Sequence, residues 1–167
     1  SVLVAPAATE KKPEVPAKQP DTTVEDPMKT VIERRPKGSL NAVTDKIEYY
    51  TNEGQQRVYL ITSFVPVTMP DGSEKERAIE FFMPVGQSSE SQQWITATMR
   101  SLSLAARGGF LDRALEDLRK VRWDRGPIRY GMFVKADGTM RPMWHDSEVA
   151  LLAYAIQETI KNRDVDK

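Results

Sequence analysis

The chain of 167 residues contains no cysteine and a single histidine, His145. The lack of thiols excludes disulfide bonds, thiol nucleophiles and thiyl radicals within this chain, and one histidine without cysteine partners is a poor basis for a zinc site. We therefore expect no catalytic or metal-ligating residues, and a module that works through a partner. The absence of cysteine also fits a reducing compartment, so a cytoplasmic location is expected.

The chain also lacks net charge, because 24 basic residues balance 24 acidic ones. No field of the whole molecule would draw it onto nucleic acid or an anionic membrane, so any such binding has to be local. Long apolar runs are missing as well. The mildly hydrophobic residues 1–8 are too short for a signal-peptide core or for the roughly 20 residues that span a bilayer, and no membrane association is expected.

Proline is concentrated near the start of the chain, where six of the eleven prolines fall within the first 36 residues. These residues show no apolar period and bury too little surface to offset their chain entropy. We interpret residues 1–38 as a flexible linker or tail and residues 39–167 as one domain. The tail is a tether to a larger body, a partner-binding peptide, or a leader without a role.

Order is expected to begin near Ile47, followed by two β-hairpins. Residues 57–65 are rich in β-branched and aromatic types, and the turn signal at residues 70–72 joins them to a strand at residues 77–83. A second hairpin is predicted around Ala136-Asp137-Gly138, and Pro142 restricts its second strand to an edge.

Helical spacing predicts three helices. The first starts at a capping-box signal formed by Ser89 and Gln92 and ends at Gly108-Gly109. The second spans about residues 110–121, and the third starts at an N-cap, Asp146. The apolar stripes expected to be buried are Ile95, Met99, Leu102 and Ala106 on the first helix, Leu111, Ala114, Leu115, Leu118 and Val121 on the second, and Val149, Leu152, Ala153, Ile156 and Ile160 on the third.

The resulting order β-β-α-α-β-β-α predicts a small single α+β domain, in which two hairpins pack with a helical pair and a C-terminal helix. Within it, the stretch from Trp94 to Gly126 is the most distinctive, because its two short-linked helices carry a ladder of arginines. We interpret it as a rigid, basic helical hairpin.

Arginines cluster around a tryptophan just after the second predicted helix. The cluster consists of Arg119, Arg122, Trp123, Arg125 and Arg129. Arginine and tryptophan are favoured anchors of protein interfaces, so docking onto an acidic protein surface is the preferred interpretation. Binding of single-stranded nucleic acid by phosphate contact and base stacking is the alternative, although residues 94–129 carry a surplus of only four positive charges, too few for tight binding at physiological salt.

The break Arg107-Gly108-Gly109 has two interpretations. Backbone amides at the start of the second helix, with Arg100 and Arg107 nearby, would suit a phosphate. A helix C-cap with a tight turn explains the same residues and is preferred, because the sequence matches neither a Walker loop nor a dinucleotide-binding motif.

Two other groups of residues invite a catalytic interpretation. His145 and Asp146 precede Ser147, but consecutive residues at a helix start point in different directions, so a cap at Asp146 is preferred to a hydrolytic triad. A helix N-terminus would also disfavour protonated His145. The acidic residues of the second helix, Asp112, Glu116 and Asp117, alternate with arginines, which indicates solvated ion pairing.

Taken in order, several short motifs resemble one family. They are Glu80-Phe81-Phe82, Trp94, Arg100-Ser101, Arg107-Gly108-Gly109, the run of residues 115–121, and Arg125-Gly126. Together they look like the TSCPD domain, which occurs at the C-terminal end of adenosylcobalamin-dependent (class II) ribonucleotide reductases and in the small companion subunits of split versions. The resemblance covers roughly Arg57 to Ile160 and is clearest from Ile79 to Gly126.

The chain departs from this family at its cysteines. Where the family has its namesake Thr-Ser-Cys-Pro-Asp motif, this chain reads Met143-Trp144-His145-Asp146, and where many members have Cys-Gly it has Arg125-Gly126. The resemblance therefore implies no metal site here.

The resemblance implies a non-catalytic accessory module or subunit that docks on a larger reductase chain, in the same or a separate polypeptide, and supports deoxyribonucleotide synthesis. The flexible connector that commonly precedes this domain in the family fits residues 1–38. Adenosylcobalamin would belong to the partner enzyme, and no cofactor is expected to bind this chain directly. An independent nucleic-acid or nucleotide binding module that uses the basic helical hairpin is the alternative, and a small hydrolase based on His145 and Asp146 is a third hypothesis.

Overall fold

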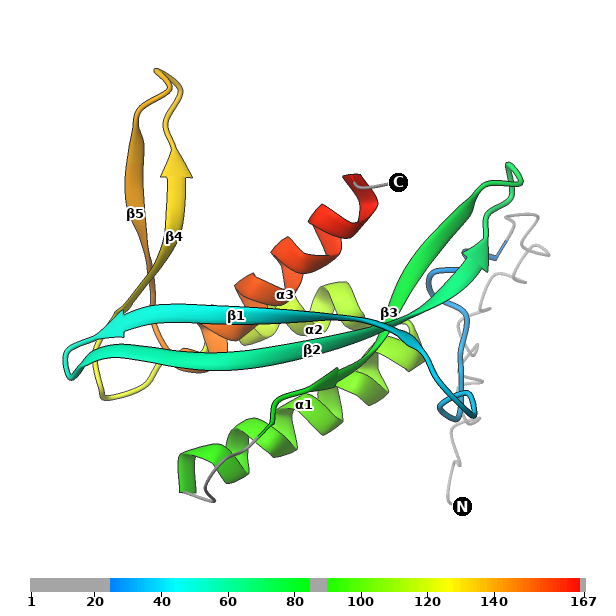
Figure 1. Ribbon diagram of the computed structural model, residues 1–167, viewed down its shortest axis with the longest axis horizontal. Helices are drawn as coiled ribbons and strands as arrows, with labels where there is room; N and C mark the ends of the chain where they lie inside the picture. Colours follow the sequence, from blue (N-terminus) through cyan, green and yellow to red (C-terminus); the bar gives the residue numbers. More distant parts are fainter. Residues whose placement is uncertain (1–24, 85–89, 166–167) are drawn as a thin grey trace, which may run out of the picture.

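The computed structural model describes residues 25–84 and 90–165 of the chain. They form a five-stranded antiparallel sheet and three helices (Figure 1). The elements are β1 (Asn41–Thr51), β2 (Gly54–Thr68), β3 (Glu74–Phe82), α1 (Glu90–Gly108), α2 (Leu111–Leu118), β4 (Ile128–Val134), β5 (Met140–His145) and α3 (Glu148–Val165). The predicted α+β class is confirmed, with the order β-β-β-α-α-β-β-α.

The sheet has the strand order β3-β2-β1-β4-β5. Its central strand, β1, was not predicted from the sequence. Ile47 and Tyr49 are buried on one side of β1, whereas Lys46 and Glu48, which alternate with them, are exposed and form an ion pair. Because a strand with one solvated face alternates apolar and charged residues, β1 carries a weaker apolar signal than β2.

Both predicted hairpins are confirmed. β2 and β3 pair antiparallel around a turn in which the amide of Gly72 donates to the carbonyl of Met69 at 2.9 Å. β4 and β5 pair antiparallel around a matching turn, where the amide of Gly138 donates to the carbonyl of Lys135 at 2.9 Å. Both turn glycines have φ near +85°, the left-handed conformation that glycine adopts without strain.

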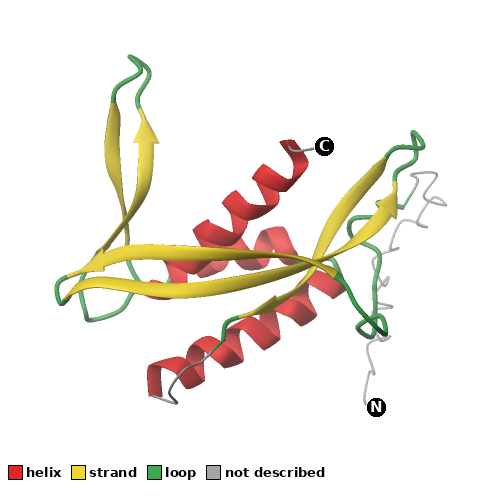
Figure 2. Cartoon of the chain, in the orientation of Figure 1, coloured by secondary structure: helices red, strands yellow, loops and turns green. Residues whose placement is uncertain are grey.

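The core lies between one face of the sheet and the helices (Figure 2). The predicted stripe on α1 is confirmed, since Ile95, Met99, Leu102 and Ala106 are all buried. The predicted stripe on α3 is confirmed for Leu152, Ala153 and Ile156, which are buried, whereas Val149 and Ile160 at its two ends are half-buried. Such side chains each contribute roughly 1.5–3 kcal/mol of burial free energy, so these stripes fix the helices on the sheet.

The second helix is shorter than predicted. α2 ends at Leu118, because Lys120 and Val121 donate their amides to the carbonyls of Asp117 and Leu118, three residues back, which tightens the chain into a turn. Val121 is therefore exposed instead of joining the buried stripe of α2. The capping signal predicted at Ser89 lies outside the described residues.

The N-terminal segment runs along β3 and the end of α1 (Figure 1). Of the predicted tail, residues 1–24 lie outside the described residues, and residues 25–38 contact the domain. The amide of Ile32 donates to the carbonyl of Arg107 at 2.8 Å, and Arg35 pairs with Glu80 on β3 at 2.9 Å. Residues that contact the domain thus begin before residue 39, the predicted start of the domain.

Candidate functional site

The junction between α1 and α2 is a helix C-cap. The amide of Phe110 donates to the carbonyl of Ala105 at 2.9 Å, and the amide of Gly109 donates to the carbonyl of Ala106 at 3.3 Å. With Gly109 at φ +91°, these two bonds form a Schellman motif. The preferred interpretation of Gly108 and Gly109 is confirmed.

Close packing at Gly109 argues against a phosphate site at this junction. The backbone of Lys29 packs against this glycine so closely that an added Cβ atom would overlap the carbonyl oxygen of Lys29. Arg107 is also engaged, because its Nη1 donates to the carbonyl of Ile79 on β3 at 3.3 Å. The N-terminal segment thus packs directly against Gly109, and β3 engages the guanidinium of Arg107.

A buried arginine that was not predicted from the sequence, Arg77, holds this junction together. The side chain is 2% exposed. Its Nη1 donates to the carbonyls of Pro27 and Thr30 at 3.1 and 2.6 Å, and its Nη2 donates to those of Ala106 and Arg107 at 2.9 and 3.2 Å. Burial lowers the pKa of Arg77, an effect that the nearby Asp26 carboxylate opposes. One guanidinium therefore joins β3, the end of α1 and the N-terminal segment.

The remaining predicted arginines lie on different elements instead of on one two-helix face. Arg100 is exposed on α1. Arg119 stacks on Tyr154 of α3, with 5.4 Å from its guanidinium carbon to the ring centre, and donates to Gln157 at 3.2 Å. Arg129 stacks on Tyr50 of β1 at 4.5 Å. The helical pair exists as predicted, and Arg119 and Arg129 lie outside it and contact α3 and β1.

Trp123 and Arg125 do lie together, as predicted, in the loop after α2. The guanidinium of Arg125 lies 5.8 Å from the centre of the Trp123 ring, and the indole nitrogen donates to the carbonyl of Gly126 at 2.6 Å. Nearby, Arg122 lies 3.8 Å from the carboxylate of Asp146, with both side chains mostly exposed. Such an exposed pair contributes at most about 1 kcal/mol.

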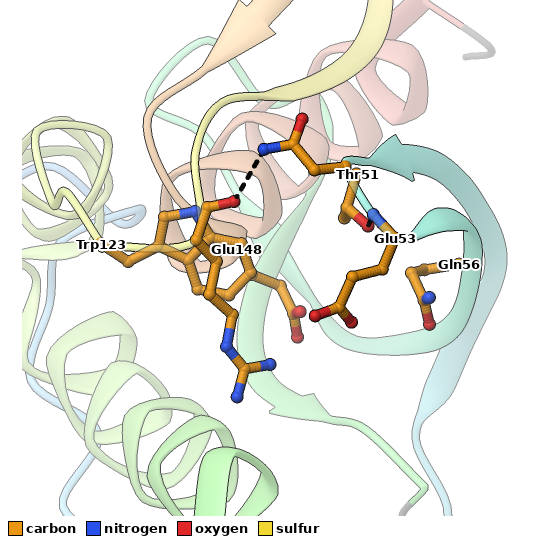
Figure 3. Close-up of a pocket in the computed structure, with 7 residues that line it drawn as sticks. Thr51, Glu53, Gln56, Trp123 and Glu148 are labelled. Atoms are coloured by element: carbon orange, nitrogen blue, oxygen red, sulfur yellow. Dashed lines mark hydrogen bonds between the residues drawn. The ribbon is translucent and has the colours of Figure 1, made fainter.

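A cavity of about 170 Å³ lies beside Trp123 (Figure 3). It is lined by Thr51, Asn52, Glu53, Gln56, Trp123, Arg125 and Glu148. Glu53 and Glu148 both contribute carboxylates to its lining (Figure 3). Burial, followed by the charge and hydrogen bond of Glu148, raises the pKa of Tyr49, so this phenol stays a donor to Glu148. The lining suits a small polar ligand but contains neither an imidazole nor a thiol.

His145, Asp146 and Ser147 do not form a catalytic triad. His145 is 6% exposed, and its Nε2 lies 3.0 Å from the carbonyl oxygen of Tyr130. Ser147 accepts a hydrogen bond at 3.0 Å from the amide of Ala150 and so caps α3. Asp146 instead points to Arg122. The predicted cap at Asp146 is wrong by one residue, because α3 begins at Glu148 and Ser147 takes the capping position.

The environment of His145 is aromatic. Its ring centre lies 5.0 Å from that of Tyr154 and 6.3 Å from that of Tyr130. Burial lowers the pKa of His145, while the hydrogen bond with Tyr130 and the charge of Asp146 act in the opposite direction. The direction of this shift agrees with the sequence-based expectation, but the main cause is burial. His145 is a neutral core residue at neutral pH.

The β4–β5 hairpin exposes side chains that sequence reasoning did not place in a site. Met132, Phe133, Val134, Met140 and Trp144 are 47 to 63% exposed. The hairpin was expected to pack with the helices, and its base does so through Ile128 in the core and Tyr130 against Tyr154 of α3. Figure 1 shows the rest of the hairpin standing away from the long β1–β2 pair. The continuous apolar run of residues 132–134 was a usable signal, because it places apolar side chains on both faces of a predicted edge hairpin.

Within residues 25–84 and 90–165, no three histidine or acidic side chains gather in a group that would hold a metal ion. In the same part of the chain, every helix is too short or too polar to cross a membrane. Comparisons of the chain with protein-family models, curated proteins and solved structures found no match.

Proposed function

We propose that this chain is a non-catalytic accessory module or subunit of a cobalamin-dependent ribonucleotide reductase, working with the larger catalytic chain in the cytoplasm. The observation that carries the proposal is that the groups with catalytic potential serve the fold. His145 is buried against the carbonyl of Tyr130, and Ser147 caps α3. A chain with these assignments acts by binding a partner.

The identity of the partner comes from the resemblance to the TSCPD domain. Part of its motifs lies in the core, whereas Phe82 and Trp94 are 56 and 63% exposed. Phe81 and Leu115 belong to the core, and Arg107-Gly108-Gly109 forms the end of α1 and the C-cap. A shared set of packing residues supports a shared fold, and the reductase partner follows as part of the proposal.

Adenosylcobalamin belongs to the catalytic chain in this proposal. Imidazole is the common protein ligand for transition metals. The single imidazole of this chain does not fit that role, because His145 is 6% exposed and its Nε2 is engaged by the Tyr130 carbonyl. The contribution of this chain is therefore to dock on the reductase and to support its assembly.

Sedimentation velocity tests the proposal. The full chain is mixed with the catalytic chain of the cobalamin-dependent reductase from the same organism, at micromolar concentrations. We expect a faster-sedimenting complex and loss of the free small species. Two independent boundaries at all ratios would contradict the proposal.

Binding of single-stranded nucleic acid is the second candidate, because Arg125 stacks on Trp123 and Arg122 is mostly exposed beside them. This function predicts an affinity for a DNA oligonucleotide that falls steeply with salt and is lost when Arg122 and Arg125 are both changed to alanine. Arg34→Ala with Lys37→Ala is the matched control, since both residues are exposed on the N-terminal segment. A titration without any binding signal would remove this candidate.

A further inference from the structure

We propose that the β4–β5 hairpin is a docking arm whose apolar face enters an apolar, acid-rimmed groove on the catalytic reductase chain. The docking arm is defined as residues 132–142, the part of the hairpin beyond its anchored base. The proposal rests on the proposed function and names the surface by which the accessory chain would dock.

The base of the hairpin is firmly packed, and the arm beyond it is not. Ile128 is fully buried and His145 is 6% exposed, and these two residues pair across the strands. β4 joins the rest of the sheet through one residue pair, Tyr50 with Arg129. The register then shifts between Arg129 and Met132, where Gly131 has φ +78°. This irregularity changes the direction of the two strands, so the arm extends away from the rest of the domain from a fixed base (Figure 1).

The register of the two strands gives the arm one wholly apolar face. Met132 pairs with Pro142, and Val134 pairs with Met140. Directly opposed residues of an antiparallel pair lie on the same face, and alternate residues return to it, so these four side chains form one surface. Met132, Val134 and Met140 are 47, 59 and 61% exposed.

A two-stranded hairpin with an uncovered apolar face is marginally stable in water and normally packs against another layer. The helices of this chain cover the sheet at β1–β3 and at the base of the hairpin, but they leave the arm exposed. Methionine side chains adapt well to a partner surface. A clustered, exposed apolar face of this kind marks an interaction site.

The charges of the arm indicate the chemistry of the groove. Phe133 pairs with Arg141 on the opposite face, which Lys135 shares by alternation. The acidic residue of the turn, Asp137, accepts hydrogen bonds from the amide and hydroxyl of Thr139 at 2.9 and 2.6 Å, and these bonds lower its pKa. Asp137 therefore stays ionised, and Lys135 and Arg141 leave the arm with a surplus of one positive charge, which an acidic partner surface complements.

The same face argues for a protein partner over single-stranded nucleic acid. Bases bind by stacking on aromatic side chains beside cations. Within the arm, the four residues of the apolar face are aliphatic or methionine and Phe133 lies on the other face, while the exposed Trp144 continues the apolar face below the arm. The aliphatic and methionine side chains of this face suit an apolar groove of a protein.

The test measures the affinity of the full chain for the catalytic reductase chain by isothermal titration calorimetry. Val134→Ser with Met140→Ser should weaken binding by about tenfold or more, because two of the four side chains of the apolar face are lost. The matched control is Val31→Ser with Leu104→Ser, since these residues are 65 and 62% exposed on other elements. Circular dichroism and thermal unfolding of each variant establish that it folds.

A second pair of variants tests the charges. Lys135→Glu with Arg141→Glu should weaken binding and reverse its dependence on salt, whereas Arg34→Glu with Lys37→Glu should leave both unchanged. A variant that unfolds is replaced by the corresponding alanine substitutions, which keep the strand pairing.

The outcomes separate the two proposals. Binding by the unchanged chain and the control, with loss in the arm variants, supports the docking arm. Equal binding by all variants overturns the docking arm and leaves the accessory function in place. No binding by the unchanged chain contradicts the accessory function and the docking arm with it. Binding of a DNA oligonucleotide that the arm variants abolish would reassign the arm to nucleic acid and overturn the proposal.

Discussion

Gly109 packs directly against the backbone of Lys29, so that a Cβ atom added to the glycine would overlap the lysine carbonyl oxygen. The contact joins the end of α1 to a segment about 80 residues earlier in the chain. Arg77 secures the same junction by donating to backbone carbonyls on both sides of it. The end of α1 and the N-terminal segment are thus built as one unit.

Gly109→Ala should destabilise the protein by about 2 kcal/mol or more, because it adds a clash with Lys29 to the cost of a left-handed non-glycine residue. Gly138→Ala is the matched control. Gly138 has φ +85° and open space around the added atom, so it should cost only about 1 kcal/mol. Urea unfolding of both variants measures the difference, and equal losses would show that the Lys29 contact is absent.

Arg77→Met should cost about 3 kcal/mol, since it removes four charged hydrogen bonds to backbone carbonyls. It should also release the N-terminal segment and speed tryptic cleavage after Lys29. Arg57→Met on the exposed side of β2 is the control and should change neither quantity. An unchanged cleavage rate in Arg77→Met would refute the role of Arg77 as the anchor of this segment.

Ser147→Ala should destabilise the protein by about 1 kcal/mol, because its hydroxyl caps α3 by accepting from the amide of Ala150. Asp146→Ala removes an exposed side chain with a long contact to Arg122 and should cost less than about 0.5 kcal/mol. Thermal unfolding compares the pair. A larger loss of stability from Asp146→Ala would show that Asp146, as predicted from the sequence, caps α3 instead of Ser147.

His145 should make the stability depend on pH. Because burial lowers its pKa below the ordinary value of 6.5, the unfolded chain binds a proton at mildly acidic pH that the folded protein does not. Its contribution is therefore complete above pH 6.5 and is lost as the pH falls from there towards the lowered pKa. The slope for one proton is at most about 1.4 kcal/mol per pH unit.

His145→Phe is the variant that isolates this effect. Urea unfolding between about pH 7 and about pH 5.5, above the range of ordinary carboxyl groups, should show a decline in the unchanged protein and a flatter profile in the variant. Parallel profiles for the two proteins would mean that His145 titrates normally in the folded state.

Much of the fold could be predicted from local patterns. The apolar stripes of α1 and α3, the turns at Gly72 and Gly138, and the C-cap at Gly109 all depend on residues close in sequence, whose spacing carries the signal. The strand β1 could not be found in this way. Its exposed face carries Lys46 and Glu48, which interrupt the apolar pattern, so that only its pairing with β2 identifies it as a strand.

The candidate site was harder to predict, because its residues are defined by tertiary contacts. The arginine ladder looked like one surface, yet Arg107 turns to the carbonyl of Ile79 and Arg119 to the ring of Tyr154. Arg77 gave no sequence signal, since a charged residue on a strand is normally exposed. The uncovered apolar face of Val134 and Met140 follows from strand register and from the absence of a covering helix at the described part of the hairpin.

The most direct test of the central claim is an assay of deoxyribonucleotide formation with three samples: this chain alone, the catalytic reductase chain alone, and the two together. We expect no turnover by this chain alone, and a rate of deoxyribonucleotide formation by the mixture above that of the catalytic chain alone. Turnover by the isolated chain, or a mixture indistinguishable from the catalytic chain alone, would contradict it.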